Sequence, residues 1–170
     1  MLRLARAIDR FTERSALLFA WLLVPLLVVV AWEVVARYGF GAPTRWAYET
    51  IYMLYAAIFM LGAAYALRTG AHVRTDFFWE KWPPRTRAAI DTVAYLLLFF
   101  PGMLLFLVSG LEATLSSFAM DERSPETSWF PPLWPLKAIV PVSALLLLVQ
   151  GVSQLAKSVH AWRTAEEFEP

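Results

Sequence analysis

The stretch LLFAWLLVPLLVVV, residues 17–30, decides the fold, because it is a long run without any charged side chain. It lies within 18 uncharged residues between Arg14 and Glu33. At about 1.5 Å per helical residue, such a run extends about 27 Å, close to the roughly 30 Å of bilayer hydrocarbon. Its apolar side chains cover every face of a helix, which suits lipid and does not suit the surface of a soluble protein. The stretch predicts a transmembrane helix.

Three further runs repeat this pattern along the chain. They contain 18, 20 and 19 uncharged residues and lie between Glu49 and Arg68, Asp91 and Glu112, and Lys137 and Lys157. The whole chain of 170 residues is 59% hydrophobic and only 17% charged, which excludes a soluble four-helix bundle. We therefore predict an all-α integral membrane protein, a single domain over residues 1–170. Its four transmembrane helices are expected at roughly 15–36, 46–67, 88–112 and 136–157.

Basic residues are distributed unequally between the two sides of these spans. Eleven of the 15 Lys and Arg residues lie before the first span, between the second and third spans, or after the fourth. Because basic loops stay on the cytoplasmic side, both termini are predicted to be cytoplasmic. Residues 158–170 are then a cytoplasmic tail.

The first 14 residues combine an apolar stripe of Leu4, Ile8 and Phe11 with four arginines on the remaining surface. That pattern predicts a short amphipathic helix on the inner leaflet, with its arginines against anionic membrane lipid. The alternative interpretation is a solvated basic tail that only fixes the orientation of the chain.

The spans lack the residues from which membrane enzymes and carriers build their sites. There is no cysteine, and the two histidines, His72 and His160, lie outside the apolar runs. We therefore expect no catalytic, cofactor-binding or metal-binding residue, and a protein that is not an enzyme. A net charge of +1 predicts no nucleic-acid partner. Four spans without an internal repeat indicate a subunit and not a complete transporter.

Charged residues instead mark the outer ends of the spans. Glu33 and Arg37 are four residues apart, as are Arg45 and Glu49, so two acid–base pairs are expected beside the turn at residues 38–44. Glu112 and Lys137 are expected at the same level. These charges either neutralise one another or contact a docking partner.

The connection after the second span contains Gly70, His72 and Asp76. Gly70 is expected to end the helix with a positive φ, and His72 to cap the last carbonyls or to meet Asp76. The aromatic stretch at residues 77–82 offers an alternative, in which this loop is a contact surface for another subunit.

Several short motifs follow one another along the chain: Arg37-Tyr38-x-Phe40, Trp46-x-x-Glu49, Gly70-x-His72-Val73-x-x-Asp76 and Pro132-x-Trp134, followed by Pro141 opening the last span. In this order they resemble the small membrane subunit of tripartite ATP-independent periplasmic (TRAP) transporters. The family usually has two consecutive acids after the tryptophan. Here the first of these positions is Tyr48, so only Glu49 can take that role.

The resemblance implies a multi-pass protein of the bacterial inner membrane that binds a large permease subunit. The large subunit is expected to carry the substrate and sodium sites and to move as an elevator, while this chain widens the immobile scaffold and needs no cofactor. A periplasmic binding protein would deliver the substrate, commonly an organic acid, through a transient contact. Two alternatives stay open, a membrane anchor for a redox or biosynthetic enzyme complex and a small exporter that dimerises into a pore.

Small residues on two spans allow close helix contact, either within this chain or with a partner. They are Ala56, Gly62, Ala63 and Ala66 on the second span and Ala144 and Gly151 on the fourth.

Overall fold

A computed structural model describes residues 2–71 and 82–164, and almost all of this part is helical. The elements, in chain order, are α1 (Leu2–Ala20), α2 (Leu23–Val34), the π-helical turn η1 (Val35–Gly39), α3 (Ala47–Arg68), α5 (Pro84–Ala94), the π-helical turn η2 (Tyr95–Phe99), α6 (Phe100–Ala119) and α7 (Trp134–Thr164). Four continuous helical segments are long and apolar enough to cross a membrane, namely Arg3–Gly39, Ala47–Arg68, Arg85–Ala119 and Trp134–Thr164. The predicted all-α fold with four transmembrane helices is confirmed.

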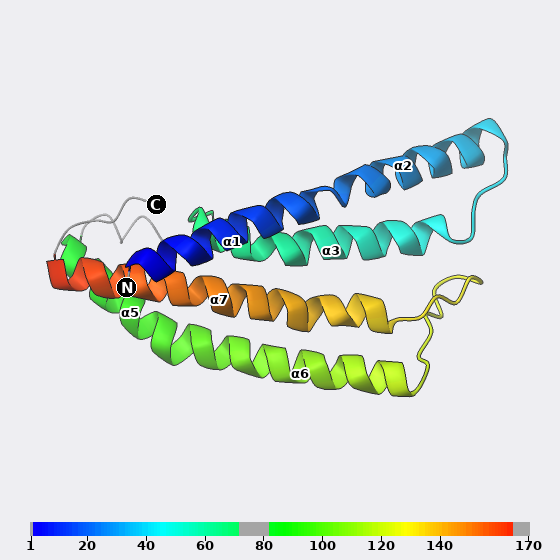
Figure 1. The fold of residues 1–170 in the computed structure, drawn as a ribbon. Helices are drawn as coiled ribbons and strands as arrows, with labels where there is room; N and C mark the ends of the chain where they lie inside the picture. The colour runs from blue at the N-terminus through cyan, green and yellow to red at the C-terminus, as the bar shows by residue number, and fades with distance from the viewer. Residues whose placement is uncertain (1, 72–81, 165–170) are drawn as a thin grey trace.

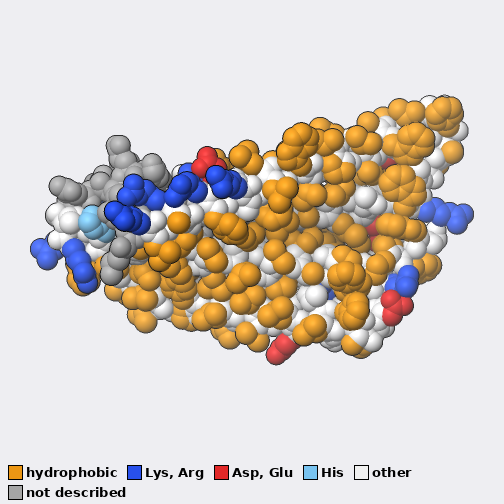
Figure 2. All heavy atoms as spheres, viewed as in Figure 1, with side chains coloured by type: hydrophobic (Ala, Val, Ile, Leu, Met, Phe, Trp, Pro, Cys, Tyr) orange, Lys and Arg blue, Asp and Glu red, His pale blue; other side chains and the backbone are white. Residues whose placement is uncertain are grey.

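The helices form an open row and do not close into a ring (Figure 1). α7 packs against α1, α3, α5 and α6, whereas α2 packs mainly on α3 and α6 mainly on α7. α1 contacts both α3 and α7, so these three helices pack around one another, while α2 and α6 lie at the edges of the row. Hydrophobic side chains cover the middle of the face seen in Figure 2, and basic side chains gather towards its two ends. This surface suits lipid or a second membrane protein.

Pro25 breaks the first span into α1 and α2. Proline has no N–H to bond the carbonyl four residues earlier, here Trp21, and its ring crowds that carbonyl. Around this point the backbone forms hydrogen bonds between residues three apart, from Trp21 N to Leu18 O at 3.2 Å and from Leu22 N to Phe19 O at 3.0 Å. The break opens an apolar cavity of about 300 Å³ between α1, α2 and α3.

Pro101 has a related effect in the third span. It lies in the first turn of α6, directly after the π-helical turn η2. A π turn adds a residue to the helix and absorbs the carbonyl that the proline leaves without a donor. The third span consequently stays continuous from α5 to Ala119.

Pro141, by contrast, does not open the last helix as the sequence indicated. α7 already begins at Trp134 and continues through the buried Pro141. Gly110 of α6 explains why the ring fits, because a Cβ on Gly110 would lie 3.1 Å from the Pro141 Cδ. The proline is a packing surface for α6.

The residues at the start of the chain are helical and amphipathic, but they are the first turns of α1 and not a separate helix. Ala5 and Thr12 are buried, while Leu4 and Phe11 are more than half exposed. The segment packs one face on the protein; within the apolar stripe Ile8 is half-buried and the other two side chains are exposed. No helix boundary lies at Arg14.

Small residues form the seams between the helices, as packing in lipid favours. Ala144 is fully buried, and a Cβ on Gly151 would lie only 2.4 Å from the Phe99 Cε1. On α3, Ala57 and Ala64 are buried, whereas the four residues predicted as candidates on this span are only half-buried. The candidates on α7 therefore pack within the chain.

Replacing Gly151 by Ala should destabilise the protein, because the new Cβ overlaps the Phe99 ring. We expect a loss of about 1–3 kcal/mol in the free energy of unfolding, measured as a lower melting temperature in detergent. Gly102→Ala is the control, since a Cβ at Gly102 meets no atom within 4 Å. Adding Phe99→Leu to Gly151→Ala should restore part of the loss. Equal melting temperatures for the two alanine variants would contradict this packing.

Candidate functional site

At one end of the row α2 leads into α3 and α6 leads into α7 (Figure 1). Polar side chains gather at this end and bond to one another. We call this end the rim, and its polar residues are Glu33, Arg37, Thr44, Arg45, Glu49, Glu122, Thr127 and Lys137. The opposite end, where α1 begins and α7 ends, is called the terminal end.

Glu33 joins the end of α2 to the turn that follows it. Its carboxylate Oε1 accepts hydrogen bonds from Arg37 Nε at 3.0 Å and Arg37 Nη2 at 2.5 Å. Its Oε2 accepts from the Thr44 backbone N at 3.1 Å and the Thr44 hydroxyl at 2.5 Å. The predicted Glu33–Arg37 pair is confirmed. The buried carboxylate is fully partnered and fixes the turn at residues 40–44.

The predicted pair between Arg45 and Glu49 is wrong. α3 begins at Ala47, so Arg45 lies in the preceding turn. The two residues therefore do not share a helix on which a spacing of four would bring their side chains together. The Arg45 side chain is exposed and forms no ion pair with any described residue. Glu49 is 3% exposed and accepts a hydrogen bond from the Thr127 hydroxyl, while its other carboxylate oxygen has no partner among the described residues. Glu49 thus joins α3 to the connection between α6 and α7.

That connection is held by its own short contacts. Lys137 donates to the Glu122 carboxylate, and the Leu133 N donates to Glu122 O at 3.0 Å. The Lys137 ammonium beside Glu122 lowers the pKa of that carboxyl below its ordinary value. Glu122 is therefore ionised at neutral pH and keeps its pair with Lys137. Lys137 was expected at this level, but its partner Glu122 was not anticipated.

Three other predicted residues lie at the rim. Trp46 precedes α3, and its carbonyl accepts hydrogen bonds from the Thr50 N at 3.1 Å and the Thr50 hydroxyl at 2.9 Å. Pro132 forms an isolated bridge with Arg123. Trp134 begins α7 and packs edge-on against Phe118, with ring centroids 5.7 Å apart. All three hold chain connections in place.

At the terminal end, Gly70 stops α3 as predicted. Its φ is +69°, and the Ala71 N donates to Ala66 O at 3.0 Å, which closes the helix end. His72 and Asp76, predicted beside it, lie outside the described residues.

The sequence analysis missed a buried polar cluster that joins α1 to α7. Lys157 Nζ lies 2.8 Å from Asp9 Oδ2, and both side chains are largely buried. Asp9 Oδ1 also accepts from Ser153 Oγ at 2.7 Å and Gln150 Nε2 at 3.0 Å. Thr12 donates to Gln150 Oε1 at 2.7 Å. The only signal in the sequence was the group of polar residues towards the end of the fourth span.

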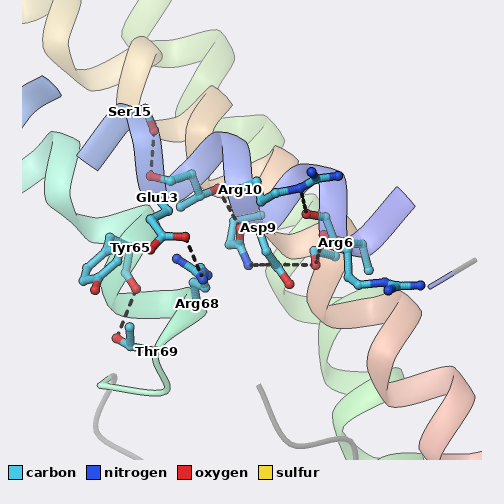
Figure 3. Close-up of polar contacts among 12 residues, drawn as sticks. Arg6, Asp9, Arg10, Glu13, Ser15, Tyr65, Arg68 and Thr69 are labelled. Atoms are coloured by element: carbon cyan, nitrogen blue, oxygen red, sulfur yellow. Dashed lines mark hydrogen bonds and ion pairs between the residues drawn. The ribbon is translucent and has the colours of Figure 1, made fainter. Parts of the chain in front are cut away.

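A second set of contacts at this end joins α3 to its neighbours. Glu13 of α1 and Arg68 of α3 point towards one another in Figure 3, with Arg68 Nη2 3.2 Å from Glu13 Oε2. Gln154 of α7 donates to Leu67 O at 3.0 Å, at the last turn of α3. The three helices α1, α3 and α7 are thus fastened together where the chain begins and ends.

The family described as "Tripartite ATP-independent periplasmic transporters, DctQ component" matches residues 26–161. The sialic acid TRAP transporter small permease protein SiaQ of Vibrio cholerae is 29% identical over 69 residues, which are 41% of this chain and 40% of that protein. The sialic acid TRAP transporter permease protein SiaT of Haemophilus influenzae is 25% identical over 151 residues, which are 88% of this chain and 23% of that protein. The chain thus matches less than half the length of either relative.

Replacing Glu33 by Gln should loosen the turn at the rim, because the amide loses the charge that attracts Arg37. We expect a lower melting temperature and faster amide hydrogen exchange over residues 40–46. Glu112→Gln is the control, since Glu112 is exposed and forms no ion pair within the described part of the chain. Unchanged exchange over 40–46 in Glu33→Gln would show that Glu33 does not hold the turn.

Proposed function

Since the chain belongs to the DctQ component of the tripartite ATP-independent periplasmic transporters, we propose that it is the small scaffold subunit of such a transporter. In this role it binds no substrate and supports a large permease subunit that moves as an elevator and is driven by sodium. A periplasmic binding protein delivers the substrate, an organic acid, by transient contact with the membrane complex.

The family match over residues 26–161 carries this proposal. The names of both relatives include sialic acid, which supports an organic acid as the substrate class. The fold is consistent with a scaffold, because the polar groups at both ends are used to fasten helices to one another. The Glu33, Glu122 and Asp9 carboxylates are each paired with a cation from the same chain. An open row also leaves a broad apolar surface for a partner.

The orientation follows from the distribution of the basic residues. The terminal end is proposed to be cytoplasmic, because eleven of the 15 basic residues belong to that side. The rim then faces the periplasm, in the inner membrane of a bacterium, where a binding protein can reach it.

Reconstitution into vesicles tests the scaffold role. Vesicles with this chain alone should take up no organic acid under a sodium gradient. Vesicles that also contain the large permease subunit of the same transporter, with the binding protein added, should take up substrate. Vesicles with the permease and binding protein alone are the control for the contribution of this chain. Sodium-driven uptake by this chain without a second membrane protein would overturn the proposal, as would failure of the two membrane proteins to purify together.

The rim also has the features of a docking surface for the binding protein. Arg45 is exposed without an ion pair in the described structure, and Tyr38 and Phe40, at the start of the same turn region, are 81% and 78% exposed. A cation that no described residue neutralises is available to an acidic surface. Such contacts at the edge of an interface act mainly on the rate of encounter and weaken as salt screens them.

Arg45→Glu should raise the concentration of binding protein that gives half-maximal uptake by about two- to fivefold at low salt, with little effect at about 1 M salt. The yield of the membrane complex should not change, because Arg45 has no partner within the described chain to lose. Arg163→Glu makes the same charge change at the terminal end and is the control. An unchanged concentration dependence in Arg45→Glu would remove Arg45 from the docking surface.

A further inference from the structure

α3 has two faces of different character. One face is buried in the row and contains Ala57, Leu61, Ala64 and Leu67. The opposite face contains Tyr48, Tyr52, Tyr55 and Phe59, which we call the aromatic stripe. These side chains are 61%, 59%, 63% and 72% exposed, respectively. Their spacing of four, three and four residues aligns them along one side of the helix.

The hydroxyl groups of the stripe have no partner in the described chain. No hydrogen bond joins the hydroxyl of Tyr48, Tyr52 or Tyr55 to any described residue. Tyr48 lies at the rim, where water and lipid headgroups can satisfy its hydroxyl, as is common for interfacial tyrosine. Tyr52 and Tyr55 lie about 6 Å and about 10 Å further along a helix about 33 Å long. At the depth of Tyr55, hydrocarbon chains offer no hydrogen-bond acceptor.

The other exposed faces of the row are mostly aliphatic, although Trp21 is exposed at the break between α1 and α2, and Trp32 and Phe118 are exposed near the rim. The most exposed side chains include Leu27 and Val28 on α2, Leu98 in η2 and Leu105 on α6, which are between 62% and 74% exposed. Aliphatic side chains suit lipid without leaving a polar group unsatisfied. The contrast within one chain indicates that the stripe is not covered by lipid.

Small residues continue the same face of α3 towards the terminal end. Gly62 and Ala66 follow Phe59 at three and seven residues and are half-buried. Gly62 lines the apolar cavity between α1, α2 and α3, together with Ala16 and Leu17 of α1, so this chain already borders the space beside it. The part of this face that is open to a helix of a second protein is therefore the aromatic part, nearer the rim.

We propose that the aromatic stripe is the surface that packs against a transmembrane helix of the large permease subunit. That helix supplies hydrogen-bond acceptors at bilayer depth to the hydroxyls of Tyr52 and Tyr55. The inference rests on the proposed function and names the face of this chain that carries it out. The permease is favoured over a second copy of this chain, because the Haemophilus influenzae relative contains the matched region as 23% of one longer chain. In that protein the region is covalently joined to further sequence.

Photo-crosslinking in membranes that contain both subunits tests the assignment. A benzophenone amino acid replaces Tyr55 in one variant and Leu105, the control on α6, in another. The Tyr55 variant should form an adduct with the permease, and the Leu105 variant should not. Adducts between two copies of this chain, equal adducts from both positions, or none from Tyr55 would overturn the inference. If the subunits still purify together, the proposed function stands; if they do not, the proposed function fails.

Removal of the hydroxyls tests the polar part of the contact. The double variant Tyr52→Phe and Tyr55→Phe should reduce the permease recovered with this chain by about tenfold under competitive detergent conditions. Its melting temperature as an isolated subunit should not change, because the hydroxyls have no partner within the described chain. Tyr48→Phe is the matched control and should have no effect on recovery. Wild-type recovery of the permease with the double variant would overturn the role of these hydroxyls.

Discussion

The buried ion pair between Asp9 and Lys157 holds the first helix against the last, and the order of the row depends on it. Ser153 and Gln150 complete the hydrogen bonding of the same carboxylate, so two charges are accepted in a place with little water. With α1 fixed to α7, α3 packs against both helices and is joined to them by Arg68 and by its last carbonyls. α2 and α6 then lie at the two edges, each packed mainly on one neighbour.

The four spans could be predicted because an uncharged run measures the depth of the apolar environment directly. The ends of the helices could not, because hydrogen bonding favours continuing a helix beyond the bilayer until a turn satisfies its last groups. The end of α3 can be predicted from Gly70, but α7 continues to Thr164 without a comparable residue to indicate where it ends. Lys157 looked like a boundary charge because its partner, Asp9, lies on another helix.

The same distinction between local and distant contacts explains the outcome at the rim. The Glu33–Arg37 pair is local to one continuous helical segment and follows from spacing alone. The Arg45–Glu49 pair required a helix that begins two residues earlier than α3 does. The hydrogen bond from Thr127 to Glu49 joins residues 78 positions apart, which no spacing rule covers. The exposure of side chains could not be predicted from spacing either. The aromatic stripe on α3 is recognised from the structure, in which the opposite face of the helix is buried.

The proposed scaffold role requires a subunit that keeps its shape while its partner moves, and the placement of the contacts in this chain fits that requirement. α7 is fastened at three depths, by Lys137 to Glu122 at the rim, by Gly151 against Phe99 within the span, and by Lys157 to Asp9 at the terminal end. A helix held at only one depth can pivot, whereas one held along its length resists tilting. α7 supports α3 on one side. The exposed face of α3 therefore belongs to a helix that is held by several neighbours, whereas α2 packs mainly on one. A partner that binds this face meets a surface whose geometry is already set, which lowers the entropy lost on assembly.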